Sequence, residues 1–310
     1  MKMATTRERC PKAEWSIGYG SPCPAGDLGP DHQASLSRGR PMSMCDCCDS
    51  RTSCLLLSVP AACNLRCKSC APREGAVLFR RGALLSFKEI VALTRQAVGF
   101  GIDKVCLTGG EPLVRWGIVR LVATLSGIPG LRDFSMTSNG ILLSGFARDL
   151  HRAGLSRLNI SLDSLDSKRF RDLSGGGELR KVLAGIDAAV AAGFETIQLE
   201  CVVEFSPDEA DARQVAGFGR ERGIEVRFIR RMDLRRRRFW PVYGGDGGHC
   251  YRCDRLRVSC DGRVFPCFFD SESFSIRRYG IDGALRLAVG HKPATGLRSD
   301  VAHCVSGATA

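Results

Sequence analysis

Short apolar runs alternate with longer amphipathic stretches along the middle of the chain. The runs are rich in Val, Ile and Leu and predict buried strands, whereas apolar residues spaced three and four apart predict helices. Ser86 and Glu89 form a capping box that predicts a helix start, and Gly154 and Gly193 each predict a helix end. Strands are expected at residues 55–59, 104–107, 134–137, 158–163, 196–203 and 224–229, and helices at residues 86–98, 116–125, 142–153, 179–192 and 208–222.

Strands that are separated by helix-length segments imply parallel pairing with right-handed crossovers. The pattern predicts an α/β fold with six βα units, which fits either a partial (β/α)6 TIM-like barrel or a doubly wound sheet. Before it, Pro, Gly, Ser and charges mix without periodicity, and after it the regularity stops. We expect a poorly ordered extension at residues 1–51, the α/β domain at 52–229 and a small cluster-binding domain at 230–310.

Composition narrows the class of protein. A chain of 310 residues can bury a sizeable core. Its 16 cysteines would suggest disulfides in a secreted chain, but residues 1–7 carry no apolar leader and no stretch is long enough to span a bilayer. The cysteine content therefore predicts a soluble protein in the reducing cytoplasm, whose thiols bind metal clusters.

The net charge of +12 is carried mostly by arginine. Such a surface can attract nucleic acid, or it can reflect a site for phosphate or carboxylate, which a guanidinium group binds through two hydrogen bonds. The run at residues 235–238 is interpreted as a solvated loop, because no recognised nucleic-acid motif accompanies it. A small-molecule or nucleotide substrate is the favoured partner, and the sequence does not indicate an oligomeric state.

Three cysteines, Cys63, Cys67 and Cys70, follow the first predicted strand. Four thiolates saturate a [4Fe–4S] cluster or a tetrahedral zinc ion, so three leave one iron open for a ligand that is not protein. Zinc binding and buried structural thiols are the alternatives. The chemistry of α/β barrels lies at the carboxyl ends of the strands, which is where this loop begins.

The run Thr108-Gly109-Gly110-Glu111-Pro112 ends the second predicted strand. A C-x3-C-x2-C triad followed by a strand that ends in GGEP resembles the radical S-adenosylmethionine (SAM) superfamily. The resemblance implies a partial barrel, a [4Fe–4S] cluster whose open iron chelates SAM, and an external one-electron donor. It also implies SAM contacts at residues near strand ends, for which turn shaping or helix capping is the alternative: Gly109, Gly110, Glu111, Thr137, Ser138, Ser161 and Asp163.

A second cysteine group, Cys250, Cys253 and Cys267, lies near the C-terminus. A zinc site is a serious alternative for a C-x2-C pair, and Cys260, Cys304 or His249 would be available as a further ligand. The group at Cys45, Cys47, Cys48 and Cys54 could hold a metal, but it matches no trusted spacing and is interpreted as surface or adventitious thiols.

The residues around the second group, from Asp254-Arg255-Leu256-Arg257 to Pro266-Cys267, resemble the GTP 3′,8-cyclase family of molybdenum-cofactor biosynthesis. The resemblance extends over residues 54–292. It implies a second [4Fe–4S] cluster on Cys250, Cys253 and Cys267 that binds the guanine base. It further implies substrate contacts at four basic residues, each of which could instead form a structural salt bridge: Lys104, Arg227, Arg255 and Arg257.

The chain departs from that family in several places. Leu56 and Cys106 occupy positions where the family usually has arginine, the connection from Met232 to Cys250 is short, and residues 306–310 lack the usual terminal glycines. Losing two phosphate-facing cations would remove about 1.5–3 kcal/mol each. Three functions compete: a GTP 3′,8-cyclase-like enzyme, a radical SAM maturase of a peptide or small natural product, and a metal-bound module that binds nucleic acid.

Overall fold

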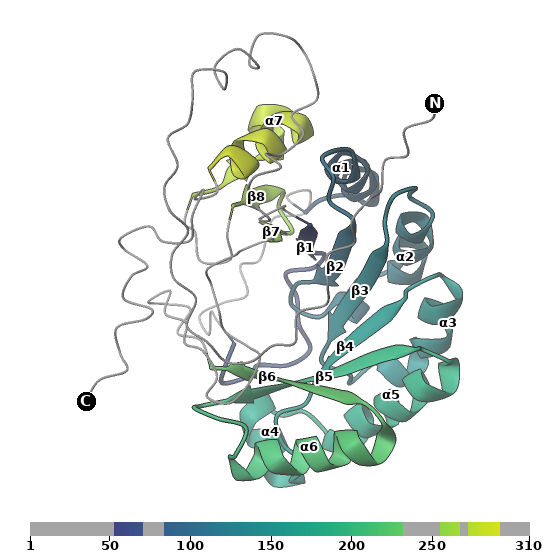
Figure 1. The fold of residues 1–310 in the computed structure, drawn as a ribbon, viewed down its shortest axis with the longest axis vertical. Helices are drawn as coiled ribbons and strands as arrows, with labels where there is room; N and C mark the ends of the chain where they lie inside the picture. Colours follow the sequence, from purple (N-terminus) through teal and green to yellow (C-terminus); the bar gives the residue numbers. More distant parts are fainter. Residues whose placement is uncertain (1–52, 71–83, 232–254, 267–271, 292–310) are drawn as a thin grey trace, which may run out of the picture. The chain divides into compact units, whose positions relative to one another are not determined.

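The computed structural model describes residues 53–70, 84–231, 255–266 and 272–291, all of which belong to one compact unit (Figure 1). The N-terminal extension, Cys250, Cys253, Cys267 and Cys304 lie outside the described residues. The described strands form one sheet: β1 (Cys54–Ser58), β2 (Lys104–Thr108), β3 (Asp133–Ser138), β4 (Arg157–Ser161), β5 (Thr196–Val203), β6 (Glu225–Arg230), β7 (Arg255–Val258), β8 (Arg263–Phe265) and β9 (Phe274–Ser275).

The order of the strands decides between the two predicted architectures. The sheet runs β6-β5-β4-β3-β2-β1-β7-β8-β9, and neighbours from β6 to β7 are parallel. In a doubly wound sheet the order in which strands are added reverses at a switch point, whereas a barrel adds each βα unit beside the previous one. Because β1 to β6 are adjacent in chain order, the predicted partial (β/α)6 barrel is confirmed, and its sheet is open.

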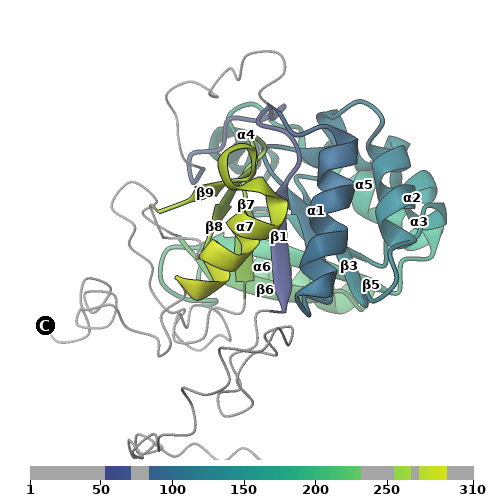
Figure 2. The ribbon, with the colours of Figure 1, turned by 90° about the horizontal axis from the view of Figure 1, so that it is seen from above.

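The helices cover one side of this curved sheet (Figures 1 and 2). This is the arrangement that right-handed crossovers between adjacent parallel strands produce. The helices and short 3-10 segments are α1 (Phe87–Gly99), η3 (Pro112–Val114), α2 (Ile118–Ser126), η4 (Leu143–Gly145), α3 (Ala147–Arg152), α4 (Ser167–Ser174), α5 (Leu179–Ala192), α6 (Ala210–Arg222) and α7 (Ile276–Gly290).

Local signals in the sequence account for where two of the helices begin and end. Ser86 caps α1: its hydroxyl accepts from the Glu89 N–H, and the Glu89 carboxylate accepts from the Ser86 N–H at 2.7 Å. Gly193 ends α5 with a φ of 90°, a left-handed conformation that glycine adopts without strain. The predicted bounds of α5 and β5 are confirmed to the residue.

Three features differ from the sequence prediction. The single helix expected at residues 142–153 is interrupted, because Phe146 leaves helical geometry with a φ of −121° and separates η4 from α3. α4 was not predicted, although Asp166 caps its start and Gly175 ends it. Beyond residue 229, β7 pairs with β1, so β7 to β9 continue the sheet, while the division of the chain into domains stays a prediction.

The strands present two different faces. Alternate residues such as Leu55 and Leu57 are fully buried and pack against the helix layer. None of the described helices is long and apolar enough to cross a membrane. We call the opposite side the concave face. It carries Cys54, Leu56, Ser58, Lys104, Cys106, Thr108, Asp133, Ser135, Thr137, Arg157, Asn159, Ser161, Gln198, Glu200, Arg227, Arg255 and Arg257.

Candidate functional site

The loop with the three cysteines follows β1 at the carboxyl edge of the sheet. Cys63 and Cys70 are exposed and Cys67 is partly buried. The loop is fastened to the end of α4, where the N–H groups of Arg66 and Lys68 donate to the carbonyls of Ser174 and Leu173 at 3.0 and 2.8 Å. Both residues that flank Cys67 are therefore fixed through their backbone, so the middle thiol has a defined place.

The thiols affect one another electrostatically. Burial raises the pKa of Cys67 to about 12, and the nearby Asp163 carboxylate and the Cys70 and Cys63 thiols act in the same direction. Burial and Cys63 also raise the pKa of Cys70. The thiolate is the form that binds metal. Because the pKa values of Cys67 and Cys70 are raised, a bound cation is needed to stabilise these thiols in the thiolate form.

Three thiols on one loop are a donor set that an iron–sulfur cluster accepts, each thiolate binding a different iron. The Leu65 N–H lies 3.4 Å from Cys63 Sγ, and N–H groups directed at sulfur are a means by which proteins tune such clusters.

Gly109 and Gly110 pack directly against the cysteine loop. A Cβ on Gly110 would overlap the carbonyl group of Ala62, and one on Gly109 would overlap Pro60. The N–H groups of Gly110 and Glu111 donate to the Pro60 and Ala62 carbonyls, each at 3.0 Å. The structure thus gives the two glycines a close backbone approach to the loop, while their predicted contact with SAM stays a prediction.

Glu111 holds together the ends of β2 and β3. Its side chain is 1% exposed; Oε1 accepts from the Leu113 N–H at 3.1 Å and from the Ser138 hydroxyl at 2.9 Å, and Oε2 accepts from the Asn139 N–H at 2.7 Å. Burial raises the pKa of the carboxyl, against the opposing effect of these hydrogen bonds. Glu111 and Ser138 therefore have protein partners within the site.

Replacing Glu111 by glutamine is expected to lower the free energy of unfolding by about 1–3 kcal/mol. Both carboxylate oxygens of Glu111 accept hydrogen bonds, but glutamine has only one carbonyl oxygen. Its NH2 group would therefore face an N–H or O–H donor and lose that hydrogen bond. Urea unfolding of the reduced, cluster-free chain measures the change, with the exposed Glu195→Gln as the matched control. An unchanged midpoint for Glu111→Gln would contradict this structural role.

Asn139 was not singled out from the sequence, although it joins β3 to the cysteine loop. Its Nδ2 donates to Asn64 Oδ1 at 2.8 Å and lies 3.7 Å from Cys63 Sγ, while its Oδ1 accepts from the Ile141 N–H at 3.1 Å. An asparagine before Gly140 is a signal for such a side-chain-to-backbone turn. Asn139 is thus a positioning residue for the loop.

Two of the predicted SAM residues lie beside Cys67. Ser161 and Asp163, together with Asn139 and Cys67, line a small cavity against α4. Asp163 Oδ1 accepts from the Val202 N–H at 2.9 Å, and burial raises the pKa of its carboxyl. Thr137 lies on the concave face, where its hydroxyl is 3.6 Å from the Cys106 thiol. The structure brings these residues to one edge, and their roles stay predictions.

All four predicted substrate residues fall on the concave face. Lys104 and Arg255 are the register partners of Cys54, Arg257 is a partner of Leu56, and Arg227 pairs in register with Glu200. Arg257 stacks on Phe265, with its guanidinium 4.0 Å from the ring centre. The same face also carries Asn159 and Glu200, two polar side chains on otherwise apolar strands. The sequence analysis did not identify either as a site residue.

Of the second cysteine group and the thiols proposed to complete it, only Cys260 falls in the described ranges. It is 5% exposed, and its carbonyl accepts from the Leu85 N–H at 2.7 Å. Burial raises the pKa of its thiol, with Asp261 contributing in the same direction. Its role as a further ligand of a second cluster stays a prediction.

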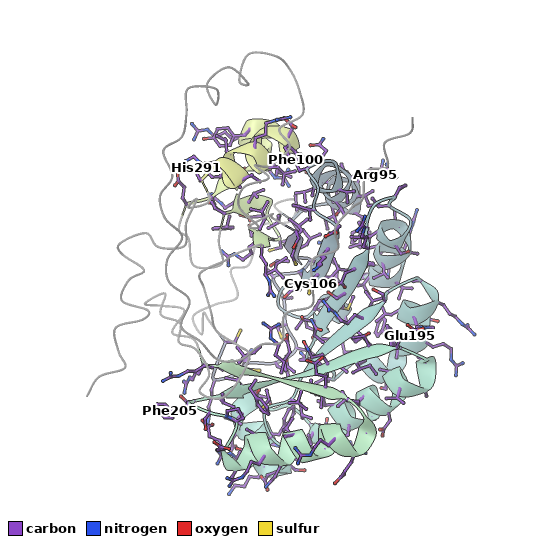
Figure 3. The ribbon with its side chains drawn as sticks, in the orientation of Figure 1. Arg95, Phe100, Cys106, Glu195, Phe205 and His291 are labelled. Carbon is purple, nitrogen blue, oxygen red and sulfur yellow. The ribbon has the colours of Figure 1, made fainter. Side chains whose placement is uncertain are left out.

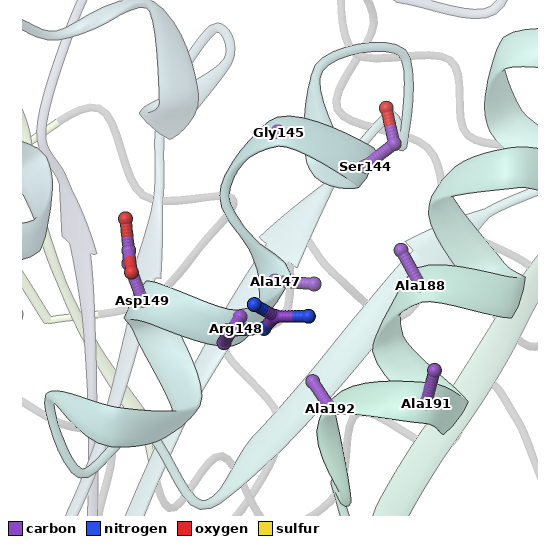
Figure 4. Close-up of a pocket in the computed structure, with 8 residues that line it drawn as sticks. All are labelled: Ser144, Gly145, Ala147, Arg148, Asp149, Ala188, Ala191 and Ala192. Carbon is purple, nitrogen blue, oxygen red and sulfur yellow. The ribbon is translucent and has the colours of Figure 1, made fainter.

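A larger pocket of about 390 Å³ opens between α3 and α5 (Figure 4). It is lined by Ala188, Ala191 and Ala192 on one side and by Arg148 and Asp149 on the other. It lies in the helix layer and contains none of the predicted site residues. We therefore assign the functional site to the strand ends and not to this pocket.

Comparison with known proteins identifies relatives of this arrangement. A family model described as "Radical SAM superfamily" matches residues 57–211. A GTP 3′,8-cyclase of Geobacter sulfurreducens is 36% identical over 81% of this chain and 93% of its own length. A GTP 3′,8-cyclase of Pseudomonas savastanoi is 45% identical over 72% of this chain and 81% of its own length.

The fold has solved neighbours as well. Native anSMEcpe with bound AdoMet matches with a TM-score of 0.55 at 16% identity, over 81% of this chain and 82% of that chain. Streptococcus suis SuiB bound to its precursor peptide SuiA matches with a TM-score of 0.51 at 20% identity, over 60% of this chain and 40% of that chain. These likenesses support the open barrel.

Proposed function

The chain belongs to the GTP 3′,8-cyclase family of the radical SAM superfamily, and we propose that it abstracts hydrogen from a guanine nucleotide by way of reductive SAM cleavage. The observation that supports this most directly is the cysteine loop, locked against Gly109, Gly110 and α4 at the carboxyl edge of the barrel. When bound, a [4Fe–4S] cluster supplies one electron to SAM, which splits into methionine and a 5′-deoxyadenosyl radical.

The protein would bind and orient the reactants. Cys63, Cys67 and Cys70 would hold the cluster, and the strand-end residues, with Ser161 and Asp163 beside Cys67, would surround SAM. The basic residues of the concave face would hold the nucleotide below. A second cluster on Cys250, Cys253 and Cys267, an external one-electron donor and a cytoplasmic location are parts of the proposal.

Anaerobic reconstitution followed by turnover with GTP deuterated at the ribose 3′ carbon tests the proposal. We expect about eight irons per chain and deuterium in the 5′-deoxyadenosine product. GTP deuterated at the ribose 5′ carbon is the matched control and should give unlabelled product. SAM cleavage without deuterium transfer would assign the chain a different substrate, such as a peptide.

A further inference from the structure

Arg115, in the turn between η3 and α2, binds two segments of backbone that are distant in sequence. Its Nη1 donates to the carbonyl of Val59, and its Nη2 donates to the carbonyl of Leu85. Val59 precedes the loop that carries the three cysteines, and Leu85 directly precedes the cap of α1. The planar fork of one guanidinium group therefore holds both ends of the segment that contains the triad, residues 60–84.

The surroundings of Arg115 show that these two carbonyls are its main partners. The side chain is half-buried, and no carboxylate pairs with it in the part of the chain that the structure describes. Its guanidinium lies over the ring of Phe87, 4.8 Å from the ring centre. Two charge-assisted hydrogen bonds to backbone carbonyls thus take the place of an ion pair, and they fix where these carbonyls lie.

Leu85 extends this connection to the C-terminal segment, by which we mean residues 255–266 and 272–291. The side chain of Leu85 is fully buried, and its N–H donates at 2.7 Å to the carbonyl of Cys260, in the turn between β7 and β8. The Cys260 thiol and the Arg115 guanidinium also interact electrostatically. A continuous connection therefore leads from the cysteine loop through Arg115 and Leu85 to the C-terminal segment.

The other contacts of the C-terminal segment lead to the barrel. Its first strand, β7, pairs with β1. Arg277 of α7 pairs with Glu89 in the first turn of α1 at 3.5 Å, and the guanidinium of Arg286 lies 5.0 Å from the ring centre of Phe100, between α1 and α7 (Figure 3). These contacts attach the segment to the strand and helix of the first βα unit, whereas the Arg115 connection attaches it to the cysteine loop.

We propose that Arg115 is a positioning residue that holds the cysteine loop in place relative to the C-terminal segment, so that SAM cleavage stays coupled to hydrogen abstraction from the substrate. This inference rests on the proposed function, in which the loop holds the SAM-cleaving cluster and Arg255 and Arg257 contact the substrate. A displacement of about 1 Å between reacting groups can slow a reaction by about a hundredfold. A displaced loop would still support SAM cleavage, but it would place the deoxyadenosyl radical farther from the C–H bond of the substrate.

Arg115→Met tests this role, with the exposed Arg120→Met on α2 as the matched control. Both full-length variants are reconstituted anaerobically and turned over with SAM and GTP deuterated at the ribose 3′ carbon. For Arg115→Met we expect the fraction of 5′-deoxyadenosine that carries deuterium to fall by about tenfold. Arg120→Met should match the wild type. Arg115→Lys keeps the charge and lacks the planar fork, so its deuterated fraction should lie between those of Arg115→Met and the wild type.

Amide hydrogen exchange of the reduced, cluster-free chain gives a second readout that needs neither cluster nor substrate. The N–H groups of Leu85 and Gly110 report on the connection, because they donate to Cys260 and to Pro60 at the base of the loop. In Arg115→Met we expect peptides with these two N–H groups to exchange about tenfold faster, while peptides from α5 exchange as in the wild type. Unchanged exchange, or faster exchange throughout the chain, would contradict a local positioning role.

The outcomes separate this inference from the proposed function. If the wild type transfers deuterium from GTP and Arg115→Met transfers an equal fraction, the inference fails and the proposed function remains. If the wild type cleaves SAM but transfers no deuterium from GTP, the proposed function fails. The exchange measurement then decides the inference by itself: faster exchange confined to the peptides of Leu85 and Gly110 supports the positioning role, and any other pattern overturns it.

Discussion

Cys67→Ala is expected to reduce SAM cleavage to an undetectable level. Cys67 is the partly buried member of the triad, and its neighbours Arg66 and Lys68 are fixed to α4 through their backbone. No other described thiol can take its place, because Cys106, Cys201 and Cys260 are buried and Cys54 lies at the opposite end of β1 from the loop. With two thiolates left, the loop cannot retain a cluster with one open iron.

The measurement is 5′-deoxyadenosine formed by the anaerobically reconstituted variant with dithionite as reductant, together with iron content and the absorbance of the cluster. Cys54→Ala is the matched control, since Cys54 lies at the opposite end of β1 and outside the triad. It should keep both the cluster of the loop and SAM cleavage. Normal cleavage by Cys67→Ala would show that the loop does not hold the catalytic cluster.

Periodicity predicted the elements that bury a continuous apolar stripe. β5 and α5 were predicted to the residue because Leu199 and Ile186 belong to regular apolar patterns that end at clear signals. The choice between a barrel and a doubly wound sheet was not available from the residues, because both alternate strands with helices. The strand order supplies it, because β3 pairs with β4 and β1 to β6 are neighbours in chain order.

Short elements escaped the sequence interpretation for a physical reason. α4 buries only Phe170 and Ser174, so its apolar pattern is too sparse to detect. β8 and β9 span a few residues each, and their ladder hydrogen bonds depend on the pairing of β8 with β7 and of β9 with β8. Periodicity describes burial along one element, so it cannot identify segments that are ordered mainly by contacts distant in sequence.

The sequence likewise predicted one part of the site and missed another. The cysteine spacing and the GGEP run located the loop and the strand end that contacts it, and the structure places them against each other. The partners of individual atoms could not be predicted. Glu111 and Ser138 bond to each other, and Asn139 reaches the loop, because three strand ends converge at this edge. Only the sheet register shows that Leu56, Cys106 and Glu200 share one face.

Gly110→Ala is expected to lower the free energy of unfolding by about 2–4 kcal/mol and SAM cleavage by about a hundredfold. The added Cβ would overlap the carbonyl of Ala62 and approach that of Ala61 at 2.9 Å. These are backbone atoms of the cysteine loop, so the clash cannot be relieved by a side-chain rotation. The loop must shift, and the hydrogen bond from the Glu111 N–H to Ala62 is strained with it.

Gly99→Ala is the matched control, because Gly99 ends α1 and a Cβ there meets nothing within 4 Å. It should stabilise the chain slightly, by up to about 1 kcal/mol, and leave catalysis unchanged. Urea unfolding of the cluster-free chain measures packing alone, and 5′-deoxyadenosine formation by the reconstituted chain measures the loop. Loss of cleavage without loss of stability would instead favour a direct contact between Gly110 and SAM, because the overlap with Ala62 must strain the chain even without a cofactor.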